Sequence, residues 1–227
     1  MIPKHVLIVG VGGLGCPASL GLARAGVTRL TLMDPDVVEL TNLHRQPWHH
    51  AADVGQPKVR SAATKLQRAF TGLKIATRQE RIDQQNAETL FTSHDLVIDA
   101  TDGVETKFLL SDTSVRTGIP LIYGGVLRFE GLAMRIEPGG PCLRCLFETP
   151  PDDAPTCAQA GVLGSMAGLI GGLQASLALR VVGPHPDPFT EEEGMALLQV
   201  IDGRSLTFRS VRVRRRADCS ACGPGNR

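Results

Sequence analysis

The segment "IVGVGGLGCP", residues 8–17, places a short apolar run directly before a glycine-rich turn. Gly10, Gly12 and Gly15 match the pattern G-x-G-x-x-G, in which a strand passes through a tight loop into a helix. Such a loop lets the backbone approach a pyrophosphate, and Pro17 suits the first turn of the following helix. The segment predicts a strand–loop–helix unit. On its own it leaves open a dinucleotide site or simple tight packing.

Strands and helices alternate along the first half of the chain, and strands follow one another in the second half. The expected strands are 6–10, 29–34, 74–82 and 95–102, then strands within 120–138 and near 195–201 and 206–213. The expected helices are 17–26, 57–70, 87–94, one that ends near 118, and a buried helix over 161–183. This order predicts an α/β fold, doubly wound and Rossmann-like, with a mostly parallel sheet and an antiparallel extension. No long linker interrupts it, so we expect a single domain over 1–227.

The composition gives no sign of a nucleic-acid or membrane partner. Lys and Arg number 24 against 23 Asp and Glu, and 42% of residues are hydrophobic. We expect no segment with the apolar length of a membrane span, and the first residues lack signal-peptide architecture, which predicts a cytoplasmic protein. The arginine-rich run "RSVRVRRRAD" at 209–218 fits a strand with solvated alternate positions, and electrostatic docking is the alternative.

Four of the six cysteines form two C-x-x-C pairs. Cys142 and Cys145 lie in "CLRC", and Cys219 and Cys222 lie in "CSAC". Four thiolates at this spacing predict a structural Zn²⁺ site with a closed tetrahedron. A redox role for each pair is the rival interpretation.

Acidic and basic residues follow the predicted second strand. Asp34 ends that strand, where dinucleotide-binding proteins hold a ribose hydroxyl. Arg45 and Lys58 come later in "MDPDVVELTNLHRQPWHHAADVGQPKVRSA", residues 33–62, within reach of a triphosphate. Hydride transfer needs no cations at a phosphate tail, whereas nucleotidyl transfer does, because charge builds on the departing pyrophosphate. Asp102 ends a later strand, where it could hold Mg²⁺ or cap the next helix.

The order of these motifs closely resembles that of the ThiF/MoeB/HesA family, the bacterial relatives of ubiquitin-activating enzymes. The matching motifs are the glycine loop, "NLHRQ", "GQPK", "DATD", "PCLRC", "CAQAGVLG" and "CSAC", which together span about residues 6–222. The resemblance implies that the chain binds ATP and adenylates the C-terminal glycine of a small ubiquitin-fold sulfur-carrier protein ending in Gly-Gly. It implies a nucleotide-binding half, about 1–118, and a carrier-binding and zinc half, about 119–227. The implied nucleotide-binding residues are Gly10, Gly12, Gly13, Gly15, Asp34, Asp36, Asn42, Arg45, Gln46, Lys58 and Asp102, with Arg45, Lys58 and Asp102 catalytic.

The resemblance also implies partners for the chain. We expect a homodimer that involves the glycine-rich 161–183 segment, and a sulfurtransferase that acts on the same carrier. Cys157, at the place where relatives can bond covalently to the carrier's sulfur, is either catalytic or an inert loop cysteine. Family members carry an N-terminal arginine segment, while the first arginine here is Arg24, and Gly103 replaces a family asparagine. Slow adenylation by the isolated chain is therefore expected.

Three hypotheses about function follow. A sulfur-carrier adenylyltransferase predicts ATP–pyrophosphate exchange that depends on the carrier. A nicotinamide-dependent oxidoreductase predicts NAD binding and no role for Lys58. A non-catalytic scaffold predicts binding without turnover.

Overall fold

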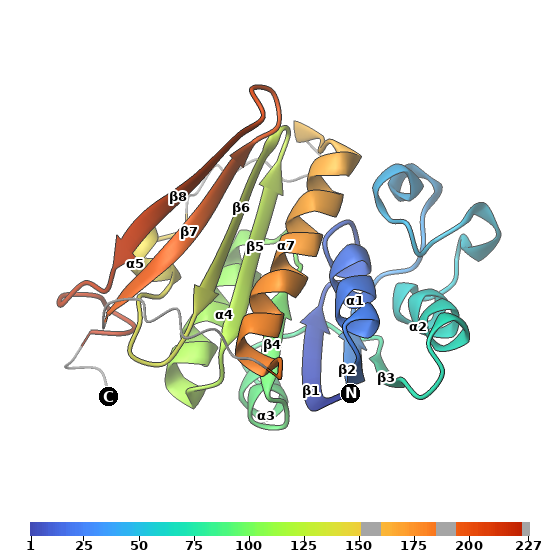
Figure 1. Cartoon of the computed structure of the whole chain (residues 1–227), viewed down its shortest axis with the longest axis horizontal. Helices are drawn as coiled ribbons and strands as arrows, with labels where there is room; N and C mark the ends of the chain where they lie inside the picture. The colour runs from blue at the N-terminus through green and yellow to red at the C-terminus, as the bar shows by residue number, and fades with distance from the viewer. Residues whose placement is uncertain (151–159, 185–193, 224–227) are drawn as a thin grey trace.

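One mixed sheet of eight strands organises the computed structural model, which describes residues 1–150, 160–184 and 194–223. The strand order is β3-β2-β1-β4-β5-β6-β7-β8 (Figure 1). The strands are β1 (Ile2–Val9), β2 (Val27–Met33), β3 (Lys74–Arg78), β4 (Leu96–Asp99), β5 (Leu121–Leu127), β6 (Glu130–Ile136), β7 (Met195–Asp202) and β8 (Thr207–Arg214). Strands β1 to β5 pair in parallel, and β5 to β8 pair antiparallel. The doubly wound sheet with an antiparallel extension is therefore confirmed.

Helices cover both faces of the sheet because the buried strands are apolar on both sides. The helices are α1 (Gly15–Arg24), α2 (Lys58–Ala69), α3 (Ala87–Thr92), α4 (Val104–Thr117), α5 (Leu143–Leu146) and α7 (Gly164–Val182). In β1, Val6 and Ile8 join the core shared with α1, α2 and α7, whereas Leu7 and Val9 join the core shared with α3, α4 and α5. Figure 1 shows α1 and α7 side by side in front of the sheet.

The chain changes direction at β1. From β1 it winds outward through β2 to β3, and it then crosses back to β4 on the other side of β1. The carboxyl ends of β1 and β4 therefore face a crevice that no crossover fills, which is where open α/β sheets bind ligands. Both the glycine loop after β1 and the "DATD" turn after β4 lie at this point.

Several element boundaries differ from the prediction. The predicted strands 74–82 and 95–102 end earlier, at Arg78 and Asp99. Segment 161–183 becomes helical only at Gly164. Two 3₁₀ helices, η1 (Leu40–Arg45) and η2 (Ala51–Asp53), were not predicted.

The arginine-rich strand β8 lacks the predicted alternation. It is the outermost strand of the sheet, and residues 207–212 are all exposed, with only Val213 buried. Since both faces of its first six residues are open to solvent, the prediction of alternately buried positions is wrong.

Helix α7 corrects a second prediction. By length and composition alone it is the one helix in the described ranges that could cross a membrane, so the expectation that no such segment exists is wrong. Half of that stretch is buried, because α7 packs against α1, β5 and β6 in the core of this domain. Its apolar character therefore has a structural cause in the fold.

Candidate nucleotide site

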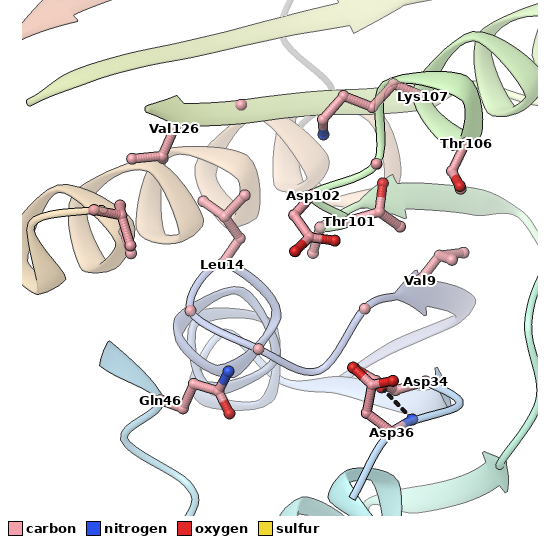
Figure 2. Close-up of a pocket in the computed structure, with 18 of the residues that line it drawn as sticks. Val9, Leu14, Asp34, Asp36, Gln46, Thr101, Asp102, Thr106, Lys107 and Val126 are labelled. Carbon is pink, nitrogen blue, oxygen red and sulfur yellow. Dashed lines mark hydrogen bonds between the residues drawn. The ribbon is translucent and has the colours of Figure 1, made fainter. Parts of the chain in front are cut away.

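A cavity of about 560 Å³ opens at the carboxyl ends of β1, β2 and β4 and extends to the β5–β6 hairpin (Figure 2). The structure brings most of the predicted nucleotide-binding residues to this one cavity. Those that line it are Gly10, Gly12, Gly13, Asp34, Asp36, Asn42, Arg45, Gln46, Lys58 and Asp102. Gly15 does not line it.

The glycine loop is a tight turn that only glycine allows at two points. Gly10 has a φ of +92°, and its N–H donates to the carbonyl of Met33 at 2.7 Å. A Cβ on Gly15 would overlap the carbonyl oxygen of Gly10. The N–H groups of Gly12 and Gly13 have no partner among the described residues, and both glycines line the cavity. They are free donors at the start of a helix, the arrangement that binds phosphate.

Asp34 stabilises the glycine loop by accepting hydrogen bonds from two backbone N–H groups. Its Oδ2 accepts the N–H of Val11 at 2.7 Å, and its Oδ1 accepts the N–H of Asp36 at 2.9 Å, the bond dashed in Figure 2. Burial raises the pKa of this carboxyl, while Lys58 and the two N–H donors oppose that rise. Since both oxygens already accept backbone hydrogen bonds, the ribose role of Asp34 stays a prediction.

Asp36 and Lys58 form an ion pair at the edge of the cavity. Lys58 begins helix α2, and its Nζ lies 2.8 Å from Oδ2 of Asp36. The Asp36 side chain is 58% exposed and the Lys58 side chain only 8%. The lysine is thus held in place, and the carboxylate is open to solvent and to a ligand.

Helix η1 and the residue that follows it, Gln46, supply three polar groups from the "NLHRQ" motif. The guanidinium of Arg45 donates to Oδ1 of Asn42 one turn earlier. Gln46 is 3% exposed, and its Oε1 has no hydrogen-bond partner in the described part of the chain. A buried amide oxygen without a partner is costly, and a ligand that offers a donor would remove that cost.

Asp102 points into the cavity from the turn between β4 and α4 (Figure 2). The N-cap of α4 is Gly103, with no side-chain cap hydrogen bond, so Asp102 does not serve as the helix cap. Its carboxylate is exposed at the crevice, where it could hold Mg²⁺. The metal role itself stays a prediction.

Beneath this turn lies a buried ion pair that the sequence analysis missed. Asp99 is fully buried and lies 3.2 Å from Nζ of Lys107, which also donates to the carbonyl of Gly124 at 2.5 Å. Asp99 further accepts the N–H and hydroxyl of Thr101. These bonds join β4, α4 and β5 and fix the turn that carries Asp102. The signal in the sequence was Lys107, a charged residue on the buried face of the helix predicted to end near 118.

His49 is a second residue that the sequence analysis missed. It is 3% exposed and lies behind the glycine loop, with Nε2 2.9 Å from the carbonyl oxygen of Val11 and Nδ1 2.9 Å from Ser61 Oγ. Burial lowers the pKa of this imidazole, and Lys65 and Lys58 add to the effect. No sequence spacing predicts this position, because Val11 and Ser61 come close to His49 only in the folded chain.

The two C-x-x-C pairs meet at the other end of the sheet. All four sulfurs lie within 4.8 Å of one another, with 3.6 Å between Cys142 and Cys219 and 3.3 Å between Cys145 and Cys222. A tetrahedron with Zn–S bonds of about 2.3 Å separates its sulfurs by about 3.8 Å. The cluster fits zinc and could hold it.

The two remaining cysteines differ in what the structure says of them. Cys16 is fully buried in α1, and burial raises the pKa of its thiol to about 12. The thiol therefore stays protonated and packs as a small apolar side chain. Cys157 lies outside the described residues, so its role stays a prediction.

Comparison with known proteins identifies relatives over nearly the whole chain. The sequence profile of the ThiF family matches residues 3–221. "SAMP-activating enzyme E1" of Haloferax volcanii is 40% identical over 230 residues, which cover 99% of this chain and 82% of that protein. "Adenylyltransferase and sulfurtransferase MOCS3" of Culex quinquefasciatus is 42% identical over 221 residues, or 96% of this chain and 49% of that protein. The chain thus spans about half the length of the MOCS3 relatives.

Solved structures share the fold. The crystal structure of E. coli MccB with ATP has a TM-score of 0.83 at 20% sequence identity, covering 97% of this chain and 67% of MccB. At that identity the likeness concerns the fold alone, and it agrees with the mixed, doubly wound sheet described above.

Proposed function

Because this chain belongs to the ThiF family, we propose that it is an ATP-dependent adenylyltransferase. Its substrate is the C-terminal glycine of a small ubiquitin-fold sulfur-carrier protein that ends in Gly-Gly. One observation carries the proposal: Arg45, Lys58 and Asp102 come from three separate segments and line one cavity with the glycine loop. The names of the relatives, an adenylyltransferase and a SAMP-activating E1, support it.

The cavity offers the groups that an attack on the α-phosphate requires. The free N–H groups of Gly12 and Gly13 hold phosphate oxygens, and Arg45 and Lys58 neutralise the β- and γ-phosphates. A carboxylate oxygen of the carrier's last glycine attacks the α-phosphorus and forms an acyl-phosphate bond. The bond from that phosphorus to the bridging oxygen breaks, and pyrophosphate leaves with the electron pair. No side chain needs to act as the nucleophile in this step.

The exposed carboxylate of Asp102 would hold Mg²⁺, an ion that prefers oxygen ligands and is bound in many nucleotide sites through one or two carboxylates. The ion would add positive charge where the phosphates carry negative charge. The cavity continues along Gly125 and Val126 to Leu132 and Val162. We assign this end of the cavity, which Glu130 also lines, to the tail of the carrier, since a Gly-Gly tail is slender and carries no side chains.

The wider setting is part of the same proposal. We propose a structural Zn²⁺ at the four cysteines, a homodimer, a sulfurtransferase that takes up the adenylated carrier, and a reducing cytoplasmic compartment that keeps the thiols reduced. Exposed leucines and open glycines at and on α7 support the dimer: Leu163, the residue before the helix, and Leu169 are each 41% exposed, and nothing lies within 4 Å of a Cβ built on Gly168 or Gly172.

ATP–pyrophosphate exchange tests the function directly. Exchange should appear when the protein is given its ubiquitin-fold partner, and it should vanish when the partner lacks its last glycine. A protein that binds both ATP and the carrier yet never exchanges pyrophosphate would be a scaffold, and the proposal would be wrong.

A further inference from the structure

The peptide unit that joins Val11 to Gly12 is held from behind by a histidine. His49 Nε2 lies 2.9 Å from the carbonyl oxygen of Val11, and Gly12 lines the cavity whereas His49 does not. A trans peptide is planar, so the N–H of Gly12 points opposite to the carbonyl that His49 binds. The hydrogen bond made by His49 therefore helps to set the direction of a free phosphate donor.

The bond belongs to a hydrogen-bond network that continues from His49 to Ser61, Lys65 and Asp53. A carbonyl can only accept, so Nε2 of His49 carries a hydrogen. Ser61 Oγ lies 2.9 Å from Nδ1 and accepts from Lys65 Nζ at 3.0 Å, and its one hydrogen is shared between Nδ1 of His49 and the carboxylate of Asp53. Lys65 is anchored by an ion pair with Asp53. The Val11 carbonyl thus selects a form of His49 with a hydrogen on Nε2.

The loop needs such an anchor because it is rich in glycine. Gly12 and Gly13 have no Cβ to resist rotation of the adjoining peptide planes. Val11 is held at both ends by side chains: Asp34 accepts its N–H at 2.7 Å, and its carbonyl accepts from His49 at 2.9 Å and from the weaker thiol donor Cys16 at 3.5 Å. With the Asp34 or the His49 bond lost, the Gly12 N–H could turn away from the ligand at little steric cost.

We infer that His49 is a positioning residue, which aims the Gly12 N–H at a phosphate of the bound nucleotide through the Val11 carbonyl. The inference rests on the nucleotide binding in the proposed function. The competing interpretation is a buried histidine that only fills space in the core. The two differ in one respect: an aiming residue affects ligands that carry phosphates, whereas a packing residue affects nucleoside and nucleotide alike.

Three substitutions of His49 separate these interpretations by calorimetric binding of ATP and of adenosine. In His49→Gln the side-chain amide can place an N–H near the position of Nε2. His49→Asn has the same amide but is one methylene shorter, and His49→Leu has no donor. We expect the Gln variant to bind ATP within about threefold of the wild type. The Asn and Leu variants should lose about tenfold to a hundredfold in ATP affinity, the scale of a hydrogen bond to a charged group, and keep their adenosine affinity.

Ser61→Ala tests the relay while His49 remains in place, which covers the case of an unstable His49 variant. It should weaken ATP by about threefold, again with adenosine unchanged. Equal losses for ATP and adenosine, or an Asn variant that binds ATP as well as the Gln variant, would overturn the inference. A wild type that binds ATP but never supports exchange would overturn the proposed function instead, and the binding series would still decide the role of His49.

Discussion

The carboxylate of Asp36 lies 2.8 Å from the ammonium group of Lys58, so two charged side chains at the candidate nucleotide site are paired with each other. The pair is asymmetric, because the lysine is nearly buried and the aspartate is 58% exposed. A triphosphate that reaches Lys58 must share this lysine with Asp36 or displace that carboxylate. The lysine is therefore positioned for a ligand before the ligand arrives.

Lys58→Ala and Arg45→Ala should each lower ATP–pyrophosphate exchange by about a hundredfold or more, the cost of losing a charged contact in the transition state. Lys74→Ala is the matched control, since Lys74 is exposed on β3 and lies away from the cavity. Exchange assays with circular dichroism separate chemistry from unfolding. Parental rates in both site variants would remove the phosphate role from these residues.

Asp102→Asn should reduce exchange by about a hundredfold at fixed Mg²⁺ and raise the Mg²⁺ concentration needed for half-maximal rate. Glu105→Gln removes a nearby exposed carboxylate that does not line the cavity, and it should leave the Mg²⁺ titration unchanged. If the two variants titrate alike, Asp102 holds no metal.

Purified protein should contain one zinc per chain, and a chelator should lower its thermal stability, because a four-thiolate site contributes directly to the free energy of folding. Cys142→Ser should lose the metal. Cys16→Ala should retain it, since Cys16 is buried in α1, away from the cluster. Zinc near zero in the parent protein would contradict the assignment.

Stability should fall as the pH drops from about 6.5 to about 4. Nε2 of His5 and Nε2 of His94 both lie 2.8 Å from Thr31 Oγ1. Burial lowers the pKa of His5 to about 4, with help from His94 and Arg29, and burial also lowers the pKa of His94. In this window the unfolded chain binds protons that the folded protein does not, so acid favours unfolding.

Urea unfolding between pH 7.5 and 4.5 measures that slope. The double variant His5→Gln, His94→Gln should flatten it without removing it, because the lowered pKa of His49 acts in the same direction. A variant with the parental slope would mean that these two histidines titrate alike in the folded and unfolded chains.

The protein should sediment as a dimer at tens of micromolar, and Leu169→Arg should convert it to a monomer by placing a charge on the exposed face of α7. Arg180→Glu, in the last turn of the same helix, provides a charge-change comparison. A parent protein that sediments as a monomer would exclude the proposed interface.

The sequence predicted the sheet and the convergence at the site because both follow from local patterns. Apolar runs marked the strands, and the glycine loop placed the nucleotide at the carboxyl end of the first one. Since parallel strands end on one edge, Asp34 and Asp102 were expected near that loop, and both line the cavity.

What the sequence could not predict depended on contacts between distant segments. The strand predicted over 95–102 stops at Asp99, because this carboxylate turns inward to Lys107 and binds the N–H of Thr101. His49 gave no signal, since its partners Ser61 and Val11 meet it only in the folded chain. The prediction of alternately buried positions in β8 failed because a residue pattern cannot show whether another layer of the protein covers a strand.

The cysteine cluster also bears on the order in which the chain folds. Cys142 and Cys219 are 77 positions apart, and α7, β7 and β8 all lie between them. Bringing together residues of such separation closes a long loop, which costs more conformational entropy than a local contact. We therefore expect a metal ion to find all four thiolates only after α7, β7 and β8 have taken their places. A chain cut before Cys219 retains only two of the four thiolates of the cluster. The amount of bound zinc would therefore measure the fraction of molecules that contain Cys219 and Cys222 and have folded completely.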